Sequence, residues 1–117
     1  MSALDRAVAE LDERRAREDS ERRARQDAGR AFLKAFYDAD LASSKVLGAH
    51  GVQAAFDGRR ILLQRPKEGV YAEGMMIVVG EQGEIDVNGR ALGTVGPADT
   101  ETRRKELIAE IISHFSL

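Results

Sequence analysis

Hydrophobic residues are sparse near the start of the chain and become periodic only later. From Ala3 to Arg25 there is neither glycine nor proline, and Ala, Leu, Glu and Arg dominate, all of which favour an α-helix. Ser2 and Asp5 have the spacing of an N-terminal helix cap. Acidic residues precede basic ones by four positions, the favourable order for helical ion pairs, at Glu10–Arg14, Glu13–Arg17, Glu18–Arg22, Asp19–Arg23 and Glu21–Arg25. The pattern predicts a charged, solvated helical arm over residues 1–29.

Three hydrophobic residues interrupt the polarity of this arm. Leu4, Val8 and Leu11 have the spacings of four and three that begin a heptad seam. The next seam positions, Arg15 and Glu18, are charged, so the seam is too short to hold a coiled coil alone. We expect a solvated helix, or one that contacts another subunit through its three hydrophobic residues. Contact with nucleic acid is a third alternative, which the interleaved acids disfavour because they repel phosphate.

A broad hydrophobic surface at helical spacing follows the arm. Gly29 is expected to bend or pause the helix first, because glycine costs about 1 kcal/mol in a helix interior. One apolar face then continues as far as Val46, and a second apolar row lies beside it. A helix on a small sheet needs only one stripe, so we expect either the C-terminal helix or a second subunit to cover the surplus. The interface residues in the second case are Leu33, Phe36, Tyr37 and Leu41.

Beyond Gly51 the hydrophobic period changes from 3.6 to two, which indicates β-strands. Asp57-Gly58 and Asn88-Gly89 are two-residue hairpin signals, and Gly74 suggests a bulge within a long strand. Every connection is short, so the strands are expected to pair antiparallel as a meander. The expected strands cover residues 52–56, 60–65, 70–79, 85–87 and 90–95.

A second helix is expected after Pro97. Asp99 or Thr100 can cap it, and its hydrophobic face comprises Leu107, Ile108, Ile111, Ile112 and Phe115. The predicted fold is therefore α+β: a long charged N-terminal helix, an antiparallel four- to five-stranded meander, and a C-terminal helix packed on the sheet. This order divides the chain into the arm, residues 1–29, and an α+β globular domain, residues 30–117.

The composition narrows the chemistry. The 117 residues contain no cysteine and have a formal net charge of −2, so thiol chemistry is excluded and the whole chain is not a basic nucleic-acid binder. The two histidines, His50 and His114, lack the spaced partners of a zinc site or a catalytic triad. We therefore predict no catalytic residue, metal or cofactor. The first residues do not form a secretory signal and no apolar run spans a membrane, so we expect a cytoplasmic protein.

One group of basic residues flanks the first two turns of the expected sheet. Such a group can contact the phosphates of a nucleic acid, with Phe56 or Tyr71 as a stacking partner. It can equally be a set of solvated charges that keep an edge strand from aggregating. The residues are Arg59, Arg60, Arg65 and Lys67.

These patterns favour a non-enzymatic protein-interaction module of the adaptor or inhibitor type. We expect it to act through its helical arm or its sheet face, as a homodimer that binds a protein partner. One alternative is a nucleic-acid-binding protein that uses the basic residues of the hairpin. Another is a small enzyme with a pocket between helix and sheet, which would use His50 or a carboxylate.

Overall fold

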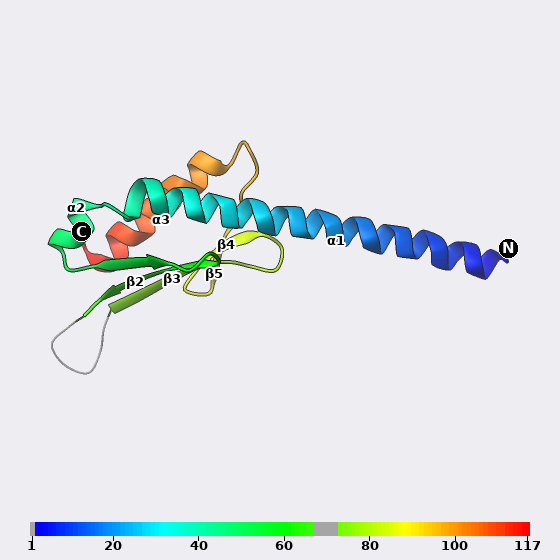
Figure 1. The fold of residues 1–117 in the computed structure, drawn as a ribbon, viewed down its shortest axis with the longest axis horizontal. Coiled ribbons are helices and arrows are strands. Elements are labelled where there is room, and N and C mark those ends of the chain that lie inside the picture. Colours follow the sequence, from blue (N-terminus) through cyan, green and yellow to red (C-terminus); the bar gives the residue numbers. More distant parts are fainter. Residues whose placement is uncertain (1, 67–72) are drawn as a thin grey trace.

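The protein is an antiparallel sheet covered on one face by two helices, one of which projects far beyond it (Figure 1). A computed structural model describes residues 2–66 and 73–117. The five strands pair in chain order, which confirms the predicted α+β meander. The elements are α1 (Ala3–Phe36), the π-helical turn η1 (Tyr37–Leu41), α2 (Lys45–Ala49), β1 (Gln53–Phe56), β2 (Arg60–Arg65), β3 (Glu73–Val79), β4 (Glu84–Val87), β5 (Arg90–Thr94) and α3 (Thr100–Phe115).

The projecting part of α1 dominates the shape of the molecule. The principal extents are 70 × 33 × 20 Å and the radius of gyration is 19.0 Å, whereas a compact domain of this length has a radius of gyration of about 13 Å. Residues 2–21 are all exposed, and as a helix they extend about 28 Å from the rest of the protein. The N-terminus therefore lies at one end of the long axis, far from the sheet (Figure 1).

A capping box begins this helix. The Asp5 amide donates to Ser2 Oγ at 3.1 Å, and the Ser2 amide donates to Asp5 Oδ2 at 3.4 Å, as the spacing predicted. The five expected ion pairs at four-residue spacing are not closed within the described arm, where the pair that forms is Asp19–Arg22 at 2.9 Å. Exposed pairs of this kind gain little over solvated charges, so helix propensity and the cap hold the arm.

The helix does not pause at Gly29, so that prediction is wrong. Gly29 is buried, and a Cβ atom there would lie 2.8 Å from Val79 Cγ1 and 3.2 Å from the Gly83 carbonyl oxygen. This glycine is needed because α1 crosses the β3–β4 turn at close range, and a side chain would hold the two apart. The cost of glycine in a helix is offset by a tight contact that sequence periodicity does not reveal.

The same turn fixes the direction in which the arm leaves the sheet. Gly83 has a φ of +81°, and a Cβ atom there would lie 2.6 Å from Arg25 Cβ. Arg25 Nε donates to the Gln82 carbonyl oxygen at 3.2 Å, and Gln26 Nε2 donates to that of Glu81 at 2.7 Å. The domain boundary at residue 29 stays a prediction, but the last turns before it rest on the globular part.

A π-helical turn ends the long helix and changes which residues are buried. The Ala42 amide donates to the Tyr37 carbonyl oxygen at 2.8 Å, five residues back, so the turn holds one residue more than a regular one. On a regular helix Asp40 would follow Phe36 on the buried face; with the extra residue, Leu41 takes that place and is buried. The chain then breaks, and Ser44 caps α2 by accepting from the Leu47 amide at 3.2 Å.

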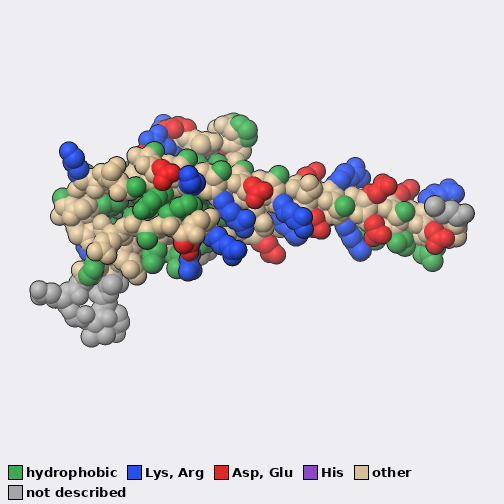
Figure 2. Space-filling model, viewed as in Figure 1, with side chains coloured by type: hydrophobic (Ala, Val, Ile, Leu, Met, Phe, Trp, Pro, Cys, Tyr) green, Lys and Arg blue, Asp and Glu red, His purple; other side chains and the backbone are tan. Residues whose placement is uncertain are grey.

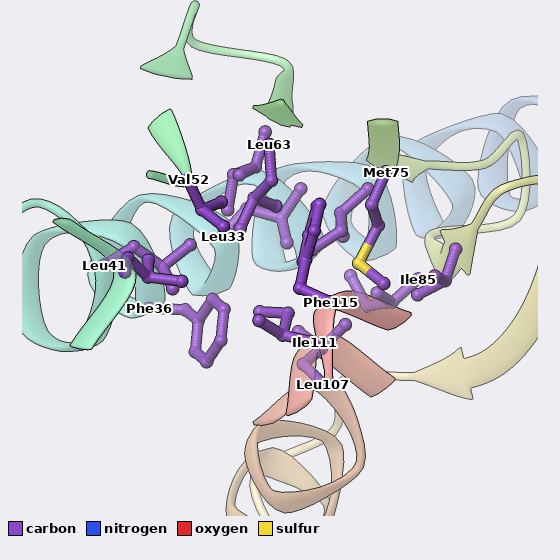
Figure 3. Close-up of a cluster of buried hydrophobic side chains, with 14 of the residues drawn as sticks. Leu33, Phe36, Leu41, Val52, Leu63, Met75, Ile85, Leu107, Ile111 and Phe115 are labelled. Carbon is purple, nitrogen blue, oxygen red and sulfur yellow. The ribbon is translucent and has the colours of Figure 1, made fainter. Parts of the chain in front are cut away.

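The core fills the layer between the sheet and the two helices (Figure 3). Alternate residues of the central strands point into it, as the period of two predicts, and the periodic faces of α1 and α3 supply the other side. The buried residues are Phe32, Leu33, Phe36, Leu41, Leu47, Val52, Ile61, Leu63, Met75, Ile77, Ile85, Val87, Leu107, Ile111 and Phe115.

Two details of the sheet differ from the sequence expectation. In the first hairpin the Asp57 amide donates to the Arg60 carbonyl oxygen at 3.2 Å, so the central pair is Gly58–Arg59, one residue later than expected. Gly74 pairs regularly with Gln64, and the irregularity lies instead between β4 and β5 at Ile85/Asp86. The last hairpin is confirmed, with positive φ angles at Asn88 and Gly89. The expected strand residues 70–72 lie outside the described residues.

Candidate interaction surfaces

The free end of α1 presents a hydrophobic stripe to solvent. Leu4, Val8 and Leu11 are 73%, 48% and 39% exposed, and their spacing places them on one face of the helix. Elsewhere along the arm, on the face that Figure 2 shows, acidic and basic side chains are interspersed. We call these three residues the arm-tip stripe. The capping box at Ser2 keeps the stripe helical, because it satisfies amides that would otherwise fray.

The second set of predicted interface residues lies largely inside the protein. Leu33, Phe36 and Leu41 belong to the core, together with Phe115 and Ile111 of α3 (Figure 3). The C-terminal helix and the sheet therefore cover this surface within one chain, which was the first of the two expected alternatives.

Tyr37, the fourth residue of that set, is half-buried against β1. Its hydroxyl donates to the Ala54 carbonyl oxygen at 3.4 Å, and its ring stacks on Phe56 at 5.8 Å between centroids. The ring and the hydroxyl therefore both contribute to the contact between η1 and the edge strand β1.

The three predicted basic residues that the structure describes do not gather into one patch. Arg59 lies in the turn before β2 and Arg60 begins that strand, whereas Arg65 ends it, roughly 16 Å from Arg60 at the usual rise of a strand. Asp57 pairs with Arg60 at 3.0 Å, and Glu73 pairs with Arg65.

These basic residues make further contacts within the protein. The guanidinium of Arg65 also lies 5.6 Å from the centre of the Phe115 ring. The amides of Arg59 and Arg60 donate to Asp57 and lower the pKa of its carboxyl. Lys67, the fourth predicted residue, lies outside the described residues.

The sheet face that the helices leave uncovered mixes apolar and acidic side chains. Leu62 and Met76 are register partners there, and Val78 pairs with Asp86. Burial raises the pKa of the Asp86 carboxyl, and the charge of the neighbouring Glu84 raises it further. The face is therefore less apolar than the arm-tip stripe, and its carboxylates would have to lose water on contact.

An open apolar groove lies at the end of the protein opposite the arm tip. It encloses about 240 Å³ between η1, α2 and α3, below the range of about 300–1,000 Å³ that small-molecule pockets usually occupy. Two large hydrophobic side chains at the groove stay exposed, Val46 at 55% and Ile112 at 47%. We call it the end groove; its lining residues are Asp40, Leu41, Ser44, Val46, Leu47, Ile108, Ile111, Ile112 and Leu117.

A bidentate ion pair joins two walls of the end groove. Arg104 Nε donates to Asp40 Oδ2 and Arg104 Nη2 to Asp40 Oδ1, each at 2.8 Å. These hydrogen bonds hold the pKa of the Asp40 carboxyl below its usual value and raise that of Arg104 further. The pair ties η1 to α3, so the π-helical turn that moves Asp40 off the buried face also positions it for this contact.

The sequence did not reveal the end groove. Val46 was expected on a continuous helix whose face packs inward, but the break at residues 42–44 turns α2 and exposes it. The only signal was the apolar residue Ile112 on the flank of the face of α3. The groove depends on the π-helical turn, which the hydrophobic pattern of the sequence does not predict.

The two histidines are both exposed. His50 ends α2, and His114 meets the Phe115 ring edge-on at 4.8 Å. Within residues 2–66 and 73–117, no three metal-binding side chains converge. No helix in this part of the chain combines the length and apolar character needed to cross a bilayer.

Comparison with known proteins finds no match: no family model, curated protein or solved structure is significantly similar to this chain.

Proposed function

We propose that the protein is a non-enzymatic protein-interaction module whose helical arm presents the arm-tip stripe to a partner protein. The observation that carries this proposal is the exposure of Leu4, Val8 and Leu11 on a helix that stands clear of its own globular part. Hydrophobic residues at spacings of four and three are the anchors with which an amphipathic helix enters a groove of its partner.

The construction of the arm supports the same conclusion. Its root is fastened to the β3–β4 turn by Arg25, Gln26 and Gly29, and its free end is capped. A helix that is formed before binding loses less conformational freedom on association than a segment that must fold. The predicted action through the arm is therefore favoured over action through the sheet face, whose apolar residues are interleaved with carboxylates. The nucleic-acid and small-enzyme alternatives stay untested.

Site-specific photo-cross-linking in the native cell tests this proposal. A benzophenone side chain at Ala7, beside the stripe, should attach to another protein chain. The matched control is Ala9, which is also exposed. It lies roughly 200° around the helix from Ala7 and faces away from the stripe. Replacing Leu4 and Leu11 by serine should abolish the adduct from Ala7. Equal labelling from Ala7 and Ala9, or none from either, would contradict the proposal.

A further inference from the structure

We infer that the arm-tip stripe of one molecule docks in the end groove of a second copy, so that copies associate head to tail. This inference rests on the proposed function and names the partner of its arm. It joins two surfaces of the chain that are each hydrophobic and each without cover in the described structure: Leu4, Val8 and Leu11 on one side, Val46 and Ile112 on the other.

The two surfaces match in kind. Between Leu4 and Leu11 the helix advances about 10 Å, so the stripe is a short ridge of aliphatic side chains. The end groove is lined mainly by aliphatic side chains and is open to solvent. A ridge that enters a groove between helices is the ordinary way in which helices pack.

Charge favours the groove over a second arm tip as the binding site. The tip is acidic: Asp5, Glu10, Asp12 and Glu13 outnumber Arg6 within residues 2–13. Two stripes packed against each other would bring these acids together, and like charges across an interface are unfavourable.

Two lysines lie close to the end groove in the chain. Lys45 precedes Val46 on α2, and Lys105 lies one turn before Ile108 on α3. Neither lysine has an acidic partner within the described residues. Arg104, beside Lys105, pairs with both Asp40 and Glu101, so these two acids and the three basic residues together carry one net positive charge. An acidic tip is thus attracted to this end of the molecule.

Geometry excludes the docking of the stripe in the groove of the same molecule. The stripe and the groove lie at opposite ends of the long axis (Figure 1), and α1 runs unbroken from the stripe to η1. The stripe can therefore reach only the groove of another copy. Because the two surfaces differ, the contact is heterologous, and it builds an open chain or a ring. The homodimer that we predicted from the sequence is then the smallest member of a series.

A complementation experiment with purified protein tests the inference. By light scattering at concentrations up to about 1 mM, which includes weak contacts, the mean mass of the wild type should rise with concentration above that of a monomer. Val8→Asp and Ile112→Asp should each weaken association at least about tenfold, because a carboxylate would lose its hydration within an apolar contact. An equal mixture of the two should form heterodimers and nothing larger, since only one intact stripe and one intact groove remain per pair.

Several results would overturn the inference. These are a monomeric wild type at every concentration, an Ile112→Asp variant that associates like the wild type, or a mixture that stays monomeric. Circular dichroism verifies folding, and Val46→Asp, at the more exposed residue of the groove, replaces Ile112→Asp if that variant unfolds.

Cross-linking with a short bis-maleimide gives an independent measurement, because the chain has no cysteine. Ala7→Cys mixed with Ala109→Cys, which is exposed on α3, should cross-link about tenfold faster than Ala9→Cys mixed with Ala109→Cys, since docking holds the thiols at a high effective concentration. Equal rates would contradict docking. The purified protein could be monomeric while the cross-linker at Ala7 still attaches to a different protein in the cell. That pair of results would refute self-association but would still support the proposed function.

Discussion

Replacing Gly29 by alanine tests whether the arm is held by close packing or merely interrupted by a weak helix residue. If Gly29 were a weak point, alanine would stabilise the protein by about 1 kcal/mol, the difference in helix propensity. In the structure the new Cβ atom would lie 2.8 Å from Val79 Cγ1 and 3.2 Å from the Gly83 carbonyl oxygen. The Val79 side chain can give way, but the backbone of the β3–β4 turn cannot do so without displacing the strands it joins.

The magnitudes favour a loss of stability. Overpacking by one methyl group usually costs about 1–3 kcal/mol, which exceeds the gain in helix propensity. We expect Gly29→Ala to lower the free energy of unfolding by up to about 2 kcal/mol. Gly48→Ala is the matched control, because Gly48 lies within α2 and no atom lies within 4 Å of the added Cβ. That variant should gain about 0.5–1 kcal/mol.

Urea denaturation of both variants measures the difference. The midpoint should fall for Gly29→Ala and rise for Gly48→Ala, with unchanged slopes. Adding Val79→Ala removes the methyl groups that the new Cβ meets, so the double variant at positions 29 and 79 should be more stable than the sum of the single effects. A Gly29→Ala protein as stable as Gly48→Ala would refute the packing argument.

Three further substitutions have signs that follow from the structure. Gly83→Ala should cost about 2–5 kcal/mol in urea denaturation, because it combines a positive φ with a clash against the backbone of Arg25. Asp86→Asn should stabilise the protein at neutral pH, because the raised pKa of the Asp86 carboxyl means that its charged form is disfavoured in the folded state. The difference in stability between variant and wild type should shrink as the pH falls and vanish below about pH 3.8. Asp40→Asn should destabilise it at neutral pH; the lowered pKa means that the ion pair with Arg104 contributes above about pH 3.8 and is lost as the pH falls through the folded-state pKa. Denaturation midpoints of each variant and the wild type across this range measure both differences.

The sequence predicted the fold well because its periods are long and unambiguous. The arm contains no helix breaker from Ala3 to Arg25, and α3 has five large hydrophobic residues at helical spacing. Short connections between the strands leave an antiparallel meander as the simplest topology. All of these are local features, which a sequence displays directly.

The failures occurred where distant segments decide the local structure. Gly29 was interpreted as a weak helix residue because its partners Val79 and Gly83 are fifty or more positions away in the sequence. The π-helical turn at residues 37–41 adds one residue to the helix so that Leu41 rather than Asp40 faces the core. The gain comes from a buried leucine and from the contact between Asp40 and Arg104, neither of which the spacing along α1 contains.

The two surfaces of the proposed contact also differ in whether local or distant residues form them. The arm-tip stripe was predicted because it depends on the spacing within one helix. The end groove was missed because it requires the break after Leu41, the turn of α2 and the flank of α3 together. Of the predicted interface residues, only those of the stripe are extensively exposed. The predicted set therefore consists of one group on the surface and a second group largely in the core.

The strength of the proposed contact follows from its size. The exposed parts of Leu4, Val8 and Leu11, together with those of Val46 and Ile112, correspond to about 4–8 kcal/mol when buried. Association costs at least about 4 kcal/mol in lost translation and rotation. The hydrophobic part alone therefore supports a dissociation constant no tighter than about 1 mM, and the charge difference between tip and groove adds a contribution that salt weakens. A contact of this strength does not form between free molecules at ordinary concentrations. It forms where copies are held close together, because their high effective concentration offsets the cost of association.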